Sequence, residues 1–324
     1  MELFYRDIKD MHEQWNYLEV IVKGEGKPTM PLISGGKRRL KIDSPFGTIG
    51  WANVEEGSYG AWFLRNDNVW TLEQMPVPPI HSQDVENAIV YSGEDRDGYW
   101  ARFFAKALGR SKVSPLYPGI WRLVKNRQYI ERGSDLPGEE QTPENLVGFY
   151  HTRPIYLDWG AAGNYGVYTL KALPDEQDGR VKWWRKKVRL GECPPVLIWF
   201  ISGLQAYVVL DGHSRLRACQ LEDSTPDYIV LKSVIEADTD YYKLAADRIY
   251  KSFAHREDNT RKPPLTVDEM NNILLQVYNP YALEEYTSRS LAIHGFEELW
   301  LKEVRAFVGK EGTDEEELDC MIYD

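Results

Sequence analysis

The sequence predicts a multi-unit α+β protein, and three observations indicate this class. Short strand-like runs dominate residues 1–145, strand and helix signals alternate over residues 146–235, and helical periodicity follows over residues 236–324. At 324 residues the chain exceeds one typical domain. Its 43% hydrophobic and 13% aromatic content is sufficient for packed cores. We therefore expect a β-rich N-terminal unit, a central α/β domain and a helical C-terminal unit over those three ranges.

The N-terminal range contains regularly spaced strand-like runs. Gly, Asn, Asp and Pro separate them, a pattern typical of an antiparallel meander. The runs are residues 18–22, 39–42, 48–52, 61–64 and 69–72. A helix is predicted over residues 98–108, ended by Gly109. The linker composition of residues 133–140 marks the first boundary.

The central range alternates between the two element types. Residues 181–189 predict a helix, and the pair Pro194-Pro195 ends it before an apolar strand at residues 196–201. A second unbroken apolar run, rich in Val and Tyr, covers residues 206–210 and fits a strand buried on both faces. A third strand is expected over residues 227–231.

Three helices are predicted in the C-terminal range. Thr266 and Glu269 form a capping-box pattern at the start of residues 267–277. Residues 281–293 and 296–308 continue the helical spacing of apolar side chains. The acidic tail at residues 314–319 is expected to be solvated.

The net charge of −11 argues against a protein whose main role is to grip a nucleic-acid backbone. It favours a basic protein partner instead. The chain begins without an apolar leader, and no run approaches the roughly 18 apolar residues of a membrane span. Cys193, Cys219 and Cys320 are sparse and lack metal-ligand spacing, which indicates a reducing compartment and no metal site. We expect a cytoplasmic protein with no membrane partner.

The strongest functional pattern is the segment from Asp211 to Arg215. Gly212 permits a sharp turn after the buried strand, and His213, Ser214 and Arg215 then open a helix. The free N–H groups and dipole of a helix start attract anions, so this pattern predicts a phosphate or nucleotide site. Arg215 would contact phosphate oxygens and His213 would donate a hydrogen bond. In the alternative interpretation, Asp211 or Ser214 only caps the helix.

A catalytic group is harder to identify from the sequence. Glu192 lies just before the paired prolines and is a possible acid or base near the helix start, or else a surface loop residue. Cys219 is expected on the buried helix face, and no histidine is placed beside Cys193 by spacing. The catalytic residues therefore remain unknown.

The string Leu210-Asp211-Gly212-His213-Ser214-Arg215, followed by Leu216-Arg217-Ala218, resembles the signature box of the ParB/sulfiredoxin superfamily. It is most similar to the Asp-Gly-His-His-Arg form of ParB-like free-serine kinases. Residues 194–199 and 227–231 resemble the flanking strands, so the resemblance covers about residues 150–235. Gly212 stands where sulfiredoxins carry their catalytic cysteine, which argues against peroxiredoxin repair. Ser214 replaces the second histidine of the kinase-like form, which weakens the case for phosphotransfer.

Two classes of function follow. In the first, the chain is an acidic bacterial binding protein, an immunity or antitoxin-like factor around a ParB-like phosphate- or nucleotide-binding domain, with a basic toxin as partner. In the alternative, it is a ParB-like enzyme that uses ATP or another nucleotide, with Mg²⁺, for phosphotransfer, or that cleaves nucleic acid. The net charge, the altered box and the lack of a catalytic base favour the binding protein.

Overall fold

The computed structural model describes residues 1–10, 12–35, 38–56, 60–71, 74–125, 147–148, 154–159, 166–236, 251, 266, 284–311 and 315–323. The chain divides into two compact units. The first combines Met1–Ser233 with Ser288–Asp324, and the second is Val234–Thr287. Both sheets and the described helices named below support the predicted α+β class.

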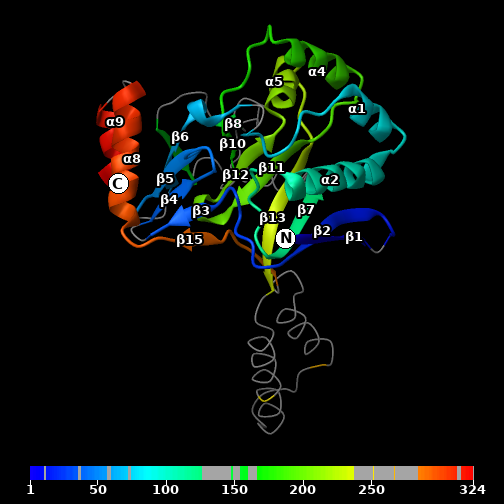
Figure 1. Cartoon of the computed structure of the whole chain (residues 1–324). Coiled ribbons are helices and arrows are strands. Elements are labelled where there is room, and N and C mark those ends of the chain that lie inside the picture. Colours follow the sequence, from blue (N-terminus) through cyan, green and yellow to red (C-terminus); the bar gives the residue numbers. More distant parts are fainter. Residues whose placement is uncertain are drawn as a thin grey trace. The chain divides into compact units, whose positions relative to one another are not determined.

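A nine-stranded mixed sheet carries most of the core (Figure 1). Its main path begins with an antiparallel hairpin and ends with parallel strands. In spatial order the strands are β1 (Glu2–Lys9), β2 (Trp15–Lys23), β7 (Gly119–Lys125), β13 (Tyr228–Glu236), β11 (Val196–Ile201), β12 (Ala206–Asp211), β10 (Val167–Thr169) and β8 (Val147–Gly148). Within the second unit, β14 (Glu284–Tyr286) pairs with the end of β13.

A second, six-stranded sheet is largely an antiparallel meander, as predicted. Consecutive strands pair antiparallel from β3 to β6, and β15 joins β3 in parallel. The spatial order is β15 (Ser290–Ala292), β3 (Leu32–Ser34), β4 (Arg39–Ile42), β5 (Gly50–Val54), β6 (Gly60–Arg65) and β9 (Ile155–Asp158). The predicted runs at residues 39–42, 48–52 and 61–64 fall on β4, β5 and β6, whereas residues 18–22 form part of β2 in the larger sheet.

The helices pack on these sheets. Helix α2 packs against β2 and β7, α4 packs against α5, α8 contacts β4 and α9 contacts β5. The α-helices of the described residues are α1 (Ser82–Ile89), α2 (Gly93–Arg110), α4 (Gly179–Arg189), α5 (His213–Leu221), α8 (Phe296–Glu311) and α9 (Glu315–Tyr323). Helices α2, α4 and α8 confirm the predictions at residues 98–108, 181–189 and 296–308. Among the residues that the structure describes, no helix is long and apolar enough to cross a bilayer.

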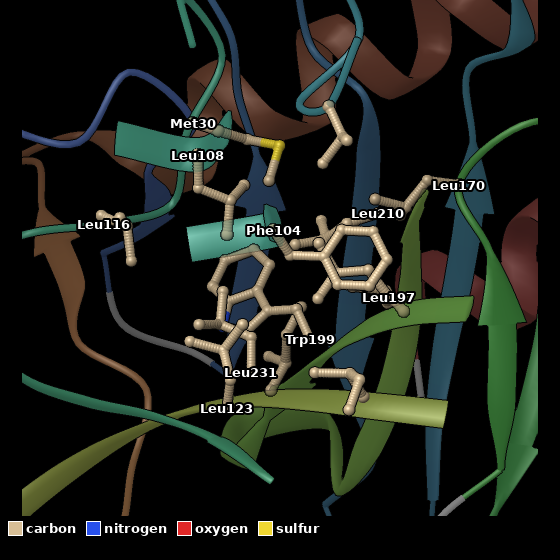
Figure 2. Close-up of a cluster of buried hydrophobic side chains, with 14 of the residues drawn as sticks. Met30, Phe104, Leu108, Leu116, Leu123, Leu170, Leu197, Trp199, Leu210 and Leu231 are labelled. Carbon is tan, nitrogen blue, oxygen red and sulfur yellow. The ribbon is translucent and has the colours of Figure 1, made fainter. Parts of the chain in front are cut away.

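One hydrophobic core joins elements from the first and the middle parts of the chain. Phe104 and Leu108 of α2 lie against Leu123 of β7 and Trp199 of β11, and all four are buried (Figure 2). Each such side chain contributes roughly 1.5–3 kcal/mol through burial. Strands from residues 1–145 and from residues 146–235 therefore share one sheet and one core. The predicted linker at residues 133–140 lies outside the described residues.

Two predicted elements are wrong. Residues 69–72 were expected as a strand, but Asp67–Val69 form a 3₁₀ turn, η1, because the Asn66 side chain accepts a hydrogen bond from Asn68 N. Residues 281–293 were expected as a helix. The structure instead has the short strands β14 and β15, because Ser290–Ala292 pair with β3 and this tertiary pairing overrides the local helical pattern.

Of the two other C-terminal predictions, one cannot be compared with the structure and the other differs from it. The helix expected over residues 267–277 lies outside the described residues. The acidic stretch expected as a solvated tail enters helix α9, whose Met321 and Ile322 are buried in a cluster with Trp300 of α8. The C-terminal end of the described chain is therefore part of a core.

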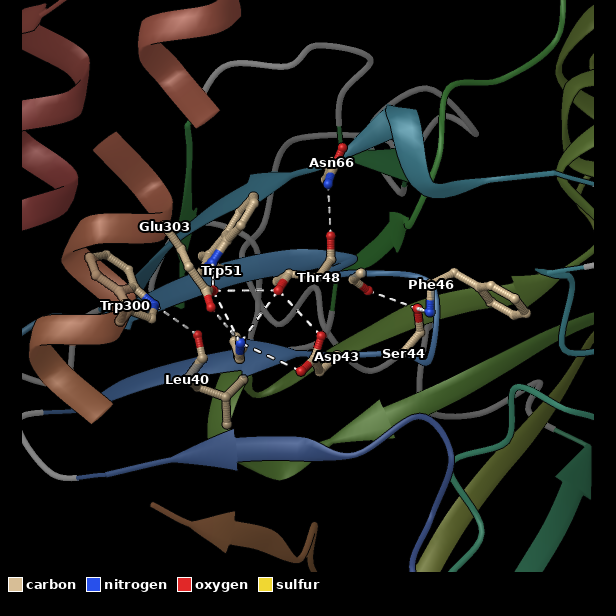
Figure 3. Close-up of polar contacts among 11 residues, drawn as sticks. Leu40, Asp43, Ser44, Phe46, Thr48, Trp51, Asn66, Trp300 and Glu303 are labelled. Carbon is tan, nitrogen blue, oxygen red and sulfur yellow. Dashed lines mark hydrogen bonds and ion pairs between the residues drawn. The ribbon is translucent and has the colours of Figure 1, made fainter. Parts of the chain in front are cut away.

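Polar contacts fix α8 across the second sheet (Figure 3). Glu303 accepts hydrogen bonds from Lys41 Nζ at 2.9 and 3.1 Å and from Trp51 Nε1 at 2.9 Å. Trp300 Nε1 donates to the carbonyl of Leu40 at 3.1 Å. Lys41 is buried, so its charge depends on these carboxylate contacts.

Candidate anion site at the start of α5

Strand pairing determines the position of the site. Strands β10 and β12 run parallel with Thr169 opposite Val209, so Lys171 and Asp211 follow at the same edge of the sheet. All residues of β12 before Asp211 are buried, as predicted for a strand covered on both faces. Crevices at the carboxyl ends of parallel strands are common ligand sites in α/β sheets.

Gly212 makes the turn into α5 with a φ of 109°, a conformation that favours glycine. A Cβ at this position would lie 2.8 Å from Arg215 Nη2 and 3.2 Å from the Cα of Val196. No described side chain caps the helix start. The residue at the N-cap position is Gly212, so neither Asp211 nor Ser214 caps the helix as the alternative interpretation expected. The first-turn N–H groups of α5 therefore lack a side-chain acceptor among the described residues.

His213 is the first residue of α5, and its side chain is buried. Only 4% of the residue is exposed, and neither Nδ1 nor Nε2 has a hydrogen-bond partner among the described residues. Burial lowers the pKa of His213 well below its ordinary value, and Lys171, Arg65 and Arg215 lower the pKa further. The imidazole is therefore neutral at pH 7. Buried polar groups nearly always have a hydrogen-bond partner, so this imidazole has an unused capacity to bind a polar group.

Two further cations lie near this imidazole. Lys171 Nζ donates to the thioether of Met75 at 3.5 Å, a weak acceptor. Burial lowers the pKa of Lys171, while the nearby Asp211 carboxylate opposes that shift. Arg65 reaches the site from the other sheet and pairs with Asp67, at 2.6 Å between Nε and Oδ1. The site thus concentrates positive charge around a neutral, unpartnered imidazole.

Arg215 lies against the strand end. It is 2% exposed, and its Nη2 donates to Asp211 Oδ2 at 2.7 Å and to the carbonyl of Pro195 at 3.1 Å. The guanidinium carbon also lies 5.5 Å from the centroid of the Trp184 ring. Arg215 therefore holds Asp211 and adds positive potential, while its predicted contact with a phosphate stays a prediction.

The remaining predicted site residues have ordinary surroundings. Ser214 is partly exposed, and its side chain makes no hydrogen bond in the described part of the chain. Glu192 accepts a hydrogen bond from Lys187 Nζ at 2.7 Å and is part of the loop after α4. This ion pair fits the surface-loop interpretation of Glu192 and leaves its predicted acid or base role without structural support.

Two thiols lie beside the site. Cys219 is buried on α5, as expected, and Cys193 is partly exposed in the loop before β11. The hydrogen bond from Cys219 lowers the pKa of Cys193, and Arg215 contributes in the same direction. The same hydrogen bond, with burial, raises the pKa of Cys219. Cys193 is therefore the more acidic thiol.

Lys171, Arg65 and Asp67 were not predicted from the sequence. Arg65 lies 104 positions before Thr169, to which it donates, and no local pattern links residues so far apart. The parallel pairing that aligns Lys171 with Asp211 also required knowledge of the sheet order. Within the described ranges, no group of three or more His, Cys, Asp or Glu side chains is arranged to hold a metal.

Comparisons with protein-family models, curated proteins and solved structures found no match for this chain. The candidate site therefore stands on its own geometry and chemistry.

Proposed function

We propose that this protein is a binding protein that holds a phosphate group, such as that of a nucleotide, at the start of α5. The observation that carries this proposal is His213, a buried imidazole at the start of α5 whose two nitrogens have no hydrogen-bond partner among the described residues. A phosphate oxygen would accept the imidazole N–H and the first-turn N–H groups of α5 together.

The surrounding charges suit such a ligand. Among the described residues, the Met75 thioether is the only hydrogen-bond acceptor of Lys171, so its ammonium would gain a strong acceptor from a phosphate. The α5 dipole favours negative charge at the same end by about 0.3–2 kcal/mol. Arg65 and Arg215 add positive potential, and each also donates a hydrogen bond to a protein group.

Binding rather than catalysis is favoured because the nearby carboxylates are held in ion pairs. Asp211 contacts Arg215 at 2.7 Å, and Glu192 contacts Lys187 at 2.7 Å. A general base must reach the proton it removes, and these contacts occupy both candidates. The wider role we propose is that of a bacterial immunity or antitoxin-like factor, supported by the net charge of −11, which suits a basic protein partner.

The test measures melting temperature and affinity with ATP, CTP and pyrophosphate as probes. A bound ligand at 100 times its Kd stabilises the fold by about 2.7 kcal/mol, so a rise in Tm is expected. Lys171→Met removes the charge but keeps an apolar chain of similar length, and should weaken binding about tenfold or more. Lys182→Met, on the exposed face of α4, is the matched control and should bind as the original chain does.

Three outcomes would overturn the proposal. The first is the absence of any Tm rise with all three probes at millimolar concentration. The second is turnover of ATP or CTP into products, which would support the enzyme interpretation. Equal weakening by Lys171→Met and Lys182→Met would also exclude a specific site, because it would indicate general charge screening.

A further inference from the structure

A separate cavity lies where α8 and α9 meet strands β4 and β5. Its volume is about 600 Å³, within the range of small-molecule sites. Three arginines line it, Arg38, Arg39 and Arg305, together with Tyr323 and Leu301. None of these residues belongs to the α5 site.

Arg39 is a buried cation whose hydrogen-bonding capacity is only partly used. It is 8% exposed; its Nη2 donates to the carbonyl of Ile322 at 3.0 Å, and its guanidinium lies 4.8 Å from the centroid of the Trp300 ring. Its Nε and Nη1 have no hydrogen-bond acceptor among the described residues. Nη1 does lie 3.2 Å from Glu297 Oε1 as an ion pair, without the geometry of a hydrogen bond. The cavity is thus lined by a buried guanidinium whose Nε and Nη1 donors lack acceptors among the described residues.

The charges around Arg39 do not balance. Burial lowers its pKa, Glu297 opposes that shift, and the positive charge of Arg305 adds to it. Arg38 Nη2 lies 3.6 Å from Oε2 of Glu56, whose side chain is mostly exposed. Arg305 Nη2 lies 3.5 Å from the Tyr323 hydroxyl. Among the described residues that line the cavity, three guanidinium groups face two carboxylates, so the positive charges outnumber the negative ones by one.

We propose that this cavity binds a small molecule through a carboxylate or phosphate group, whose oxygens accept from Arg39 and Arg305. The planar fork of arginine matches both kinds of oxyanion. Leu301 and the Tyr323 ring offer apolar surface to the rest of the ligand. This inference does not depend on the function proposed for the α5 site.

The experiment uses the full chain carrying Lys171→Met, so that binding of phosphate at α5 is weakened and the cavity is measured against a lower background. Calorimetric titration with inorganic phosphate and with benzoate distinguishes the two possible head groups. Arg305→Gln is expected to weaken the binding of the preferred probe about tenfold or more, because it removes a charge-assisted contact. Arg38→Gln should act in the same direction.

Lys302→Gln is the matched control, since Lys302 is exposed on the same helix and the substitution removes the same charge. It should change the affinity less than about twofold, as expected for a screened surface charge. Arg305 is itself exposed, so loss of folding does not complicate its substitution. Failure of both probes to bind, or equal effects of Arg305→Gln and Lys302→Gln, would overturn the proposal.

Discussion

Arg65, at the end of β6, donates to both the carbonyl and the hydroxyl of Thr169, at the end of β10, over 3.2 and 2.8 Å. The two residues belong to different sheets, so this contact links the sheets beside His213. The same guanidinium holds Asp67, and Asp67 Oδ1 accepts from Ala172 N at 3.0 Å. The position of Lys171, between Thr169 and Ala172, therefore depends on both sheets.

Removal of this link should destabilise the fold. Arg65→Met leaves the Asp67 carboxylate without its cation, and loss of one partner of a buried pair costs about 3–5 kcal/mol. The free energy of unfolding in urea is the measurement. Arg102→Met is the control, because Arg102 is 45% exposed in its pair with Asp7 and exposed pairs contribute about 0–1 kcal/mol. Equal losses in the two variants would contradict the structural role of Arg65.

His213 should make stability depend on pH in a defined window. Its folded-state pKa lies well below the ordinary 6.5, so the unfolded chain binds a proton first as the pH falls. The stability contribution is therefore fully present above pH 6.5 and declines below it, by up to about 1.4 kcal/mol per pH unit. His213→Gln should flatten urea-unfolding free energies between pH 7 and pH 5.

Bound pyrophosphate should also reduce this slope, because a nearby anion favours the protonated imidazole. The exposed His294 gives the control variant, His294→Gln, whose pH dependence should match that of the original chain. An unchanged slope in His213→Gln would show that the buried imidazole is not responsible.

Cys193 should react with iodoacetamide before Cys219. The thiolate is the reactive form, and the hydrogen bond from Cys219 lowers the pKa of Cys193 while burial protects Cys219. Mass spectrometry after brief labelling at pH 7.5 measures the order of modification. Cys219→Ala removes the hydrogen bond and should slow labelling of Cys193, with Cys320 as the internal reference in each sample. Faster labelling of Cys193 in that variant would contradict the proposed cause.

Glu303 should be important for docking α8. Glu303→Ala removes two carboxylate contacts of the Lys41 ammonium, whose side chain is 6% exposed, and leaves it Asp43 Oδ2 at 3.5 Å. The loss should cost roughly 1.5–3 kcal/mol of unfolding free energy, as for hydrogen bonds to a charged group. Glu298→Ala, at an exposed position of the same helix, should cost less than about 1 kcal/mol. Urea unfolding followed by tryptophan fluorescence compares the two variants.

Local patterns allowed much of the central region to be predicted. The apolar runs of β11 and β12, the glycine turn and the start of α5 each depend on neighbouring residues, and the structure confirms them. The charges around His213 could not be predicted in this way. Lys171 lies beside Asp211 because β10 pairs with β12 in parallel, and Arg65 belongs to a strand of the other sheet. Strand β15 was missed for the same reason, since its partner β3 lies more than 250 residues earlier.

The docking of α8 on the N-terminal sheet also affects how the protein is made. Trp300 donates a hydrogen bond to Leu40, which lies 260 positions earlier in the sequence. Arg39 donates one to Ile322, which lies 283 positions later. At roughly 5–20 residues per second, a ribosome needs about 15–50 s to travel that distance. Throughout that interval, strands β4 and β5 have been synthesised but lack the helices that cover them. Docking of these helices on the sheet is therefore a late event, and until it happens the nascent chain is most open to chaperones and to aggregation.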